Sequence, residues 1–134
     1  MDLQLPYRPD TGFDGLYGLE ITQLTDERAI GQIAVREELK QPFGLVHGGV
    51  YAALAEALAS FATGVAVGPG KLAVGLSNQT SFLRPITAGT IHGRAERKHA
   101  GRTTWVWEVE ITDDEGRLCV LTRMTVAVRA ASEG

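Results

Sequence analysis

Glu56 has the clearest chemical potential in this sequence, because of the residues around it. It is the only charged side chain between Gly48 and Val67, in a stretch that is otherwise apolar or small. A carboxylate that loses solvation in such surroundings has a raised pKa, which suits it to act as a general base or a nucleophile. A solvated glutamate without any chemical role fits the same pattern, so the surroundings alone leave both interpretations open.

A second candidate site lies just before this stretch, in Gly44-Leu45-Val46-His47-Gly48-Gly49. Two glycines at the start of a helix leave its first N–H groups unobstructed, and such groups bind anions. If they face a carbonyl group, they stabilise the negative charge that develops on its oxygen during acyl transfer. A tight turn that simply needs glycine is the alternative interpretation.

A helix from Gly48 to Val67 would position both groups. Its apolar residues recur at three- and four-residue spacing, at Val50, Leu54, Ala57, Leu58, Phe61 and Val65. The predicted opposite face carries Glu56 among small residues, namely Gly49, Ala52, Ala53, Ala59, Ser60 and Thr63. Because this face lacks the several charges of a solvated helix, we expect another backbone or a ligand to cover it. Ser60 lies one turn after Glu56, within reach of its carboxylate or of a water beside it.

The length of this helix bears on how the two groups could cooperate. Gly48 and Glu56 are eight residues apart, which is about 12 Å at the rise of a helix. One helix therefore cannot easily bring its own N-terminus and its own glutamate to the same carbonyl. Two antiparallel helices related by a two-fold axis could do so. If both groups are functional, the sequence predicts an obligate dimer with two composite sites.

The rest of the chain is predicted to be mostly β. Residues 1–17 contain Pro6, Pro9, Gly12 and Gly15 and indicate an irregular lead-in with at most a short turn of helix. Alternating apolar residues predict strands at residues 19–24, 30–35, 72–82, 90–98, 103–112 and 117–129. Gly68-Pro69-Gly70 should end the helix. With 134 residues, the chain is expected to be one α+β domain, residues 1–134, in two layers.

Composition excludes several classes of function. The net charge of −3 gives no electropositive surface for nucleic acid or an anionic membrane, and 44% hydrophobic residues suffice for one core. The single cysteine, Cys119, excludes an intramolecular disulfide and a CxxC motif, and is expected to pack in a strand. His47, His92 and His99 lack the spacing of a zinc site, so no metal is expected. Without a signal-peptide pattern or a membrane span, a cytoplasmic protein is expected.

The stretch from Gly44 to Glu56 resembles the helix-start motif of hotdog-fold acyl-CoA thioesterases. The most similar branch is that of the phenylacetate-degradation and Arthrobacter-type 4-hydroxybenzoyl-CoA thioesterases, with His-Gly-Gly and an acidic residue nine positions after the histidine. Ser77 to Pro85, ending in Phe-Leu-Arg-Pro, and Gly101-Arg102-Thr103-Thr104 are similar to later family segments. The resemblance covers nearly the whole chain and implies a hotdog fold in the order ββ-helix-ββββ.

The resemblance also implies roles for individual residues. Glu56 would be the nucleophile or the base for the hydrolytic water, and the backbone N–H of Gly48 would polarise the thioester carbonyl from the neighbouring subunit. Gln41 would assist, His47 would hold the loop and that glutamine, and Ser60 stands where the branch has threonine. Further contacts to substrate or CoA are implied for Gly49, Ser77, Asn78, Phe82, Arg84, Arg102, Thr103 and Thr104. No cofactor beyond the CoA of substrate and product is implied, and the expected assembly is a homodimer or a homotetramer built from two dimers.

Two other functions are kept as alternatives. One is a hotdog dehydratase or hydratase acting on a 3-hydroxyacyl or enoyl thioester, although the chain lacks a His-x-Pro-Gly-type loop before the helix. The other is a non-catalytic acyl-CoA binding module, which would not need Glu56. The expected reaction is hydrolysis of an aryl- or medium-chain acyl-CoA, and residues around Tyr51, Leu54, Phe61 and Phe82 would line the acyl pocket without fixing its ligand.

Overall fold

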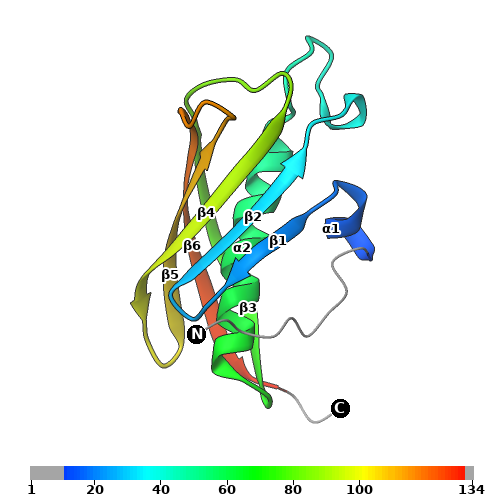
Figure 1. Cartoon of the computed structure of the whole chain (residues 1–134). Helices are drawn as coiled ribbons and strands as arrows, with labels where there is room; N and C mark the ends of the chain where they lie inside the picture. Colours follow the sequence, from blue (N-terminus) through cyan, green and yellow to red (C-terminus); the bar gives the residue numbers. More distant parts are fainter. Residues whose placement is uncertain (1–10, 132–134) are drawn as a thin grey trace.

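One long helix and one antiparallel sheet make up most of the molecule (Figure 1). The computed structural model describes residues 11–131. Its elements are α1 (Gly12–Leu16), β1 (Glu20–Leu24), β2 (Arg28–Ala34), a 3-10 helix (Glu37–Leu39), α2 (Gly48–Val67), β3 (Lys71–Phe82), β4 (Thr90–Ala100), β5 (Thr104–Thr112) and β6 (Leu118–Ala130). The strands form a six-stranded sheet in the order β1-β2-β4-β5-β6-β3, which leaves β1 and β3 at its edges.

This element order confirms the predicted ββ-helix-ββββ arrangement and the α+β class. The predicted helix bounds match α2. The first strand was predicted correctly to within one residue, whereas the second was placed two residues too late, because Arg28 and Ala29 already pair with Glu96 and Ala95 of β4. The short turn of helix expected within the lead-in is present as α1. Residues 1–10 of the lead-in lie outside the described residues.

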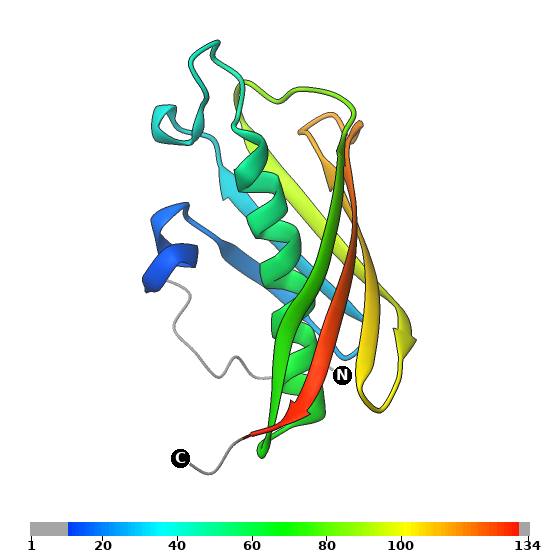
Figure 2. The same cartoon turned by 180° about the vertical axis from the view of Figure 1, so that it is seen from behind.

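The sheet curves around α2, so that the helix contacts strands on more than one side (Figure 2). Leu54 and Leu58 are fully buried, as their place on the apolar face predicts. Ala59 and Thr63 are buried within the single chain as well, so the prediction that another backbone or a ligand covers them was wrong. Thr63 Oγ1 donates a hydrogen bond to the Ala59 carbonyl at 2.7 Å and accepts one from Trp107 Nε1 at 2.8 Å. The chain's own sheet therefore covers more of the α2 surface than the sequence indicates.

By length and apolar composition α2 would be able to cross a membrane. Half of its most apolar window is buried inside the molecule, against the sheet. The same property is typical of the core helix of a globular domain, and here it follows from the way the sheet surrounds the helix.

The turn between β5 and β6 is organised by the buried carboxylate of Asp113. Its Oδ1 accepts hydrogen bonds from the backbone N–H groups of Glu115 and Arg117, both at 3.0 Å, and its Oδ2 pairs with Arg117 Nε at 2.8 Å. Burial opposes the charged form, but these hydrogen bonds outweigh it and hold the pKa of Asp113 below its usual range.

We therefore expect the stability of the Asp113→Asn variant to depend less on pH under acid conditions than that of the wild type. A carboxylate with a depressed pKa stabilises the fold above the pKa it has in the unfolded chain, and this contribution is lost as pH falls through its folded pKa. The wild-type melting temperature should fall steeply below about pH 4, whereas the variant should melt lower at neutral pH and lose less on acidification. Thermal unfolding followed by circular dichroism across pH measures this, and parallel curves would contradict it.

Candidate active site

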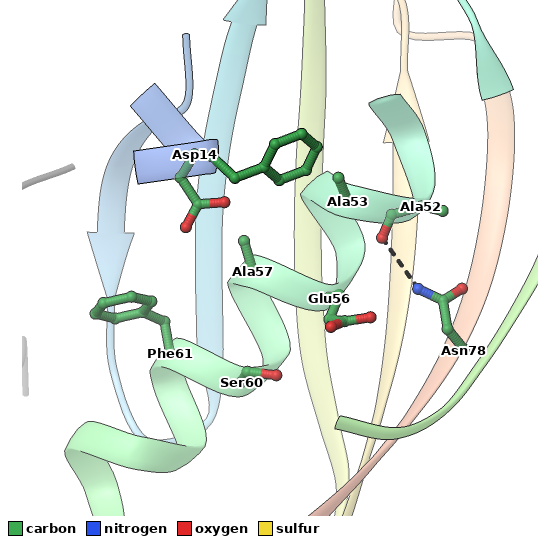
Figure 3. Close-up of a pocket in the computed structure, with 9 residues that line it drawn as sticks. Asp14, Ala52, Ala53, Glu56, Ala57, Ser60, Phe61 and Asn78 are labelled. Atoms are coloured by element: carbon green, nitrogen blue, oxygen red, sulfur yellow. Dashed lines mark hydrogen bonds between the residues drawn. The ribbon is translucent and has the colours of Figure 1, made fainter. Parts of the chain in front are cut away.

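Glu56 lies in a pocket of about 410 Å³ between α2, α1 and β3, which we call the Glu56 pocket (Figure 3). Its carboxylate lies against Gly75 of β3, where an added Cβ would come within 3.3 Å of Glu56 Cδ. A side chain at position 75 would thus require the Glu56 carboxylate to shift by a few tenths of an ångström. Glu56 is exposed in the single chain, so the predicted loss of solvation does not occur within one copy.

Ser60 and Asn78 line the same pocket but differ in their bonding. Asn78 Nδ2 donates to the Ala52 carbonyl at 3.0 Å, and its Oδ1 accepts from Thr80 Oγ1 at 2.6 Å. Asn78 therefore ties β3 to α2. Ser60 Oγ is buried and has no hydrogen-bond partner among residues 11–131, so it does not bond to Glu56 within one chain.

The start of α2 presents a free backbone donor. His47 is the N-cap, and its Nδ1 accepts a hydrogen bond from the Gly49 N–H at 2.8 Å. This bond requires a ring that is neutral at Nδ1 and carries its proton on Nε2. The N–H of Gly48 has no acceptor within the part of the chain that the structure describes. The His47 side chain thus accepts the N–H of Gly49 and leaves the N–H of Gly48 available to a ligand.

Gly48 opens into a second pocket, of about 440 Å³, which we call the Gly48 pocket. Gln41, Phe82 and Arg84 also line it. Gln41 Oε1 accepts a hydrogen bond from the Phe43 N–H, which leaves the amide NH₂ of Gln41 as its free donor end. The Phe82 ring lies so close to Gly48 that an added Cβ would be 2.9 Å from it. This pocket therefore combines backbone and side-chain donors with an aromatic wall.

The Glu56 pocket and the Gly48 pocket have no lining residue in common among the described residues. The structure thus brings Gln41, Gly48, Phe82 and Arg84 together, and Glu56, Ser60 and Asn78 together, but does not join the two groups within one chain. His47 and Gly49 line a third pocket, beside α1. Ser77 is exposed on β3, next to a register irregularity.

The candidate CoA contacts at positions 102–104 lie elsewhere. Thr104 pairs with Ala127, which in turn pairs with Val74 near the start of β3, whereas Arg84 N bonds to the Cys119 carbonyl at the other end of β6. Within one chain, Arg102 and Arg84 are therefore at opposite ends of the sheet.

Two residues that line the Glu56 pocket, Phe13 and Asp14 of α1, were missed from the sequence. The approach of Gly75 of β3 to the Glu56 side chain was missed as well. The spacing of Asp14 and Tyr17 was the available indication of a helical turn, since the Tyr17 hydroxyl donates to Asp14 Oδ1 at 2.8 Å.

Cys119 was predicted to be a packing residue, and its side chain is fully buried. Burial raises the pKa of its thiol, and the nearby Asp113 carboxylate raises it further. A thiol that stays protonated is a poor nucleophile. This leaves Glu56 as the better candidate for nucleophilic chemistry.

Comparisons with known proteins place the chain in a family. A family model described as the thioesterase superfamily matches residues 43–120, which include all of α2. The chain is 36% identical over 118 residues to 1,4-dihydroxy-2-naphthoyl-CoA hydrolase of Listeria monocytogenes, covering 88% of this chain and 96% of that protein. It is 38% identical over 111 residues to the proofreading thioesterase EntH of Cronobacter turicensis, covering 83% of this chain and 81% of that protein.

A solved structure agrees with these sequence matches. The crystal structure of a thioesterase from Haemophilus influenzae superimposes with a TM-score of 0.88 at 30% identity, covering 97% of this chain and 96% of that one. Its similarity extends over the sheet and the central helix together. The chain therefore belongs to the thioesterase superfamily, has the hotdog fold and is a thioester hydrolase.

Proposed function

We propose that this protein is an acyl-CoA thioesterase whose active site is shared by two copies of the chain. Glu56 of one copy supplies the carboxylate, and Gly48 of the other supplies the N–H that polarises the thioester carbonyl. The observation that carries this proposal is the separation of the Glu56 pocket from the Gly48 pocket within one chain. Each pocket holds only half of the groups that acyl transfer needs.

The free edge of the sheet supports the pairing of two copies. β3 is twelve residues long and, within residues 11–131, pairs with β6 alone, on its inner side. Leu72, Val74 and Leu76 are 50%, 53% and 62% exposed along it. A long apolar edge is a template for another strand, and an antiparallel β3–β3 pair would set the two α2 helices side by side in opposite directions. Association of two such dimers into a homotetramer is the larger assembly that we propose.

The reaction follows from these groups. The Gly48 N–H stabilises the charge on the carbonyl oxygen while Glu56 attacks the carbonyl carbon, or takes a proton from a water that attacks it. The C–S bond then breaks and CoA leaves as a thiolate, which takes up a proton. In the nucleophilic version, water hydrolyses the resulting anhydride and restores the carboxylate. Gln41 would add its amide donor at the carbonyl. Ser60, which lines the Glu56 pocket, would hold the water after its buried Oγ, which has no partner among the described residues, turns toward that pocket.

The Glu56 pocket favours an aryl or medium-chain acyl group. Its walls are the rings of Phe13 and Phe61 and the methyl groups of Ala53 and Ala57. Flat apolar walls of this kind suit an aromatic ring or a short alkyl chain. The relative from Listeria is named for an aromatic acyl-CoA, which supports the aryl alternative.

An antiparallel pair of chains brings opposite ends of the two sheets toward each other. CoA would therefore contact Arg84 of one chain and, on the other chain, the face that carries Arg102, Thr103 and Thr104. No metal or redox cofactor is required, since a thioester is already activated and its thiolate is a good leaving group. A cytoplasmic location fits a CoA-dependent hydrolase.

Release of free CoA thiol from a panel of acyl-CoAs tests the proposal. The panel contains 4-hydroxybenzoyl-, phenylacetyl-, hexanoyl- and palmitoyl-CoA. We expect thiol release with at least one compact substrate and no conversion of enoyl-CoA to 3-hydroxyacyl-CoA. A folded dimer that releases no thiol from any member would overturn the proposal, and hydration of enoyl-CoA would favour the dehydratase alternative.

A further inference from the structure

Phe13 of α1 stands between two pockets on the same side of α2. It lines the Glu56 pocket, and it also lines a pocket of about 500 Å³ that we call the α1 pocket. Leu16, Leu39 and Val50 form apolar walls of the α1 pocket, which is also lined by the polar or charged residues Arg36, Glu38, Lys40 and His47. Phe13 is the only described residue that belongs to both linings. Phe13 therefore lies at the border between the two pockets.

The ring of Phe13 is not part of the core. Phe13 is 67% exposed, whereas Tyr17, four residues later, is 3% exposed and anchors α1. The Tyr17 hydroxyl bonds to Asp14 Oδ1, and the guanidinium of Arg36 donates to the Leu16 carbonyl. These contacts hold α1 in place without the Phe13 ring, whose aromatic contact is an edge-on approach to Tyr17 at 5.3 Å between ring centroids.

An apolar ring that is exposed on a fixed helix, beside the candidate catalytic carboxylate, is placed to contact substrate. We propose that Phe13 closes the distal end of the acyl pocket and limits the enzyme to compact acyl groups, a single aromatic ring or a short alkyl chain. This inference rests on the proposed function. A longer chain that starts at Glu56 would meet the Phe13 ring, and without that ring it would continue along the apolar walls of the α1 pocket that Leu16, Leu39 and Val50 form.

Phe13→Ala removes the wall and should change chain-length preference. We expect the ratio of kcat/KM for dodecanoyl-CoA to that for hexanoyl-CoA to rise about tenfold or more, because each added methylene finds apolar surface instead of a clash. Phe13→Trp enlarges the wall and should shift the ratio the other way. The matched control is Leu118→Ala, which should leave the ratio unchanged. Leu118 is an exposed aliphatic residue at the β5–β6 end of the sheet.

Initial rates of thiol release across a series of acyl-CoAs from four to sixteen carbons give the profile of each variant, and thermal unfolding shows that each is folded. Opposite shifts for the two Phe13 variants support the inference. Unchanged profiles in folded, active variants would overturn it and leave the proposed function standing. If the wild-type dimer releases no thiol from any member, the proposed function itself fails, and the inference fails with it.

Discussion

Glu56→Gln should abolish hydrolysis of acyl-CoA while leaving the fold and substrate binding intact. The amide has nearly the same shape as the carboxylate but can neither attack a carbonyl nor take a proton from water. Loss of such a group lowers kcat by about 10²–10⁴. Because Glu56 is exposed in the single chain and does not support its core, the melting temperature should change little. Thiol release measures kcat, and calorimetric titration with substrate measures binding.

Glu110→Gln is the matched control for this substitution. Glu110 is an exposed carboxylate on β5, between the buried residues Val109 and Ile111 that face the helix, so it points to the opposite side of the sheet. Its loss should leave kcat within about twofold, as is usual for a surface substitution. Retention of more than a tenth of the wild-type kcat in the Glu56 variant would show that another group performs the chemistry.

Replacing Gly48 by proline should remove the backbone donor without breaking α2. Gly48 is the first residue of the helix, the position at which proline is favoured because its missing N–H has no helical partner. His47 already has an extended backbone, with φ −64° and ψ 135°, which suits the residue before proline. Loss of one donor to a developing oxyanion costs about 10²–10³ in kcat. We expect a loss of that size in thiol release.

The Gly48→Ala variant separates the effect of losing the backbone N–H from the steric effect of an added Cβ. Both substitutions add a Cβ that meets the Phe82 ring, which is 60% exposed and therefore free to move. Only the proline variant lacks the N–H. A kcat of the alanine variant at least tenfold above that of the proline variant supports the role of the donor. Equal losses in the two variants would assign the effect to the displaced phenylalanine ring instead.

Much of the fold could be predicted because its pattern is local. The spacing of Leu54 and Leu58 defines the buried face of α2, and Gly68-Pro69-Gly70 marks its end. Ala59 and Thr63 were misassigned because a helical projection assumes one flat neighbour. Here the sheet curves around the helix, and Trp107 reaches Thr63 from a strand more than forty residues later in the chain.

The short helix α1 shows why the site was predicted less completely than the fold. Its five residues include two glycines, Gly12 and Gly15, so local propensity does not favour a helix. Tertiary contacts of Tyr17 and Arg36 stabilise it instead. For the same reason Phe13 and Asp14 could not be placed beside Glu56 from the sequence. The residues of the helix-start motif were identifiable because their chemistry depends on neighbours in sequence.

The central claim of the proposed function is that two chains share each active site. Mixed dimers test this claim directly. Glu56→Gln and Gly48→Pro chains, each nearly inactive alone, are unfolded together in equal amounts and refolded. If each site takes Glu56 from one chain and Gly48 from the other, roughly a quarter of the sites contain both intact groups, so roughly a quarter of wild-type thiol release should return. Activity that stays at the level of the separate variants would show that Glu56 and Gly48 act within one chain, and would contradict the composite site.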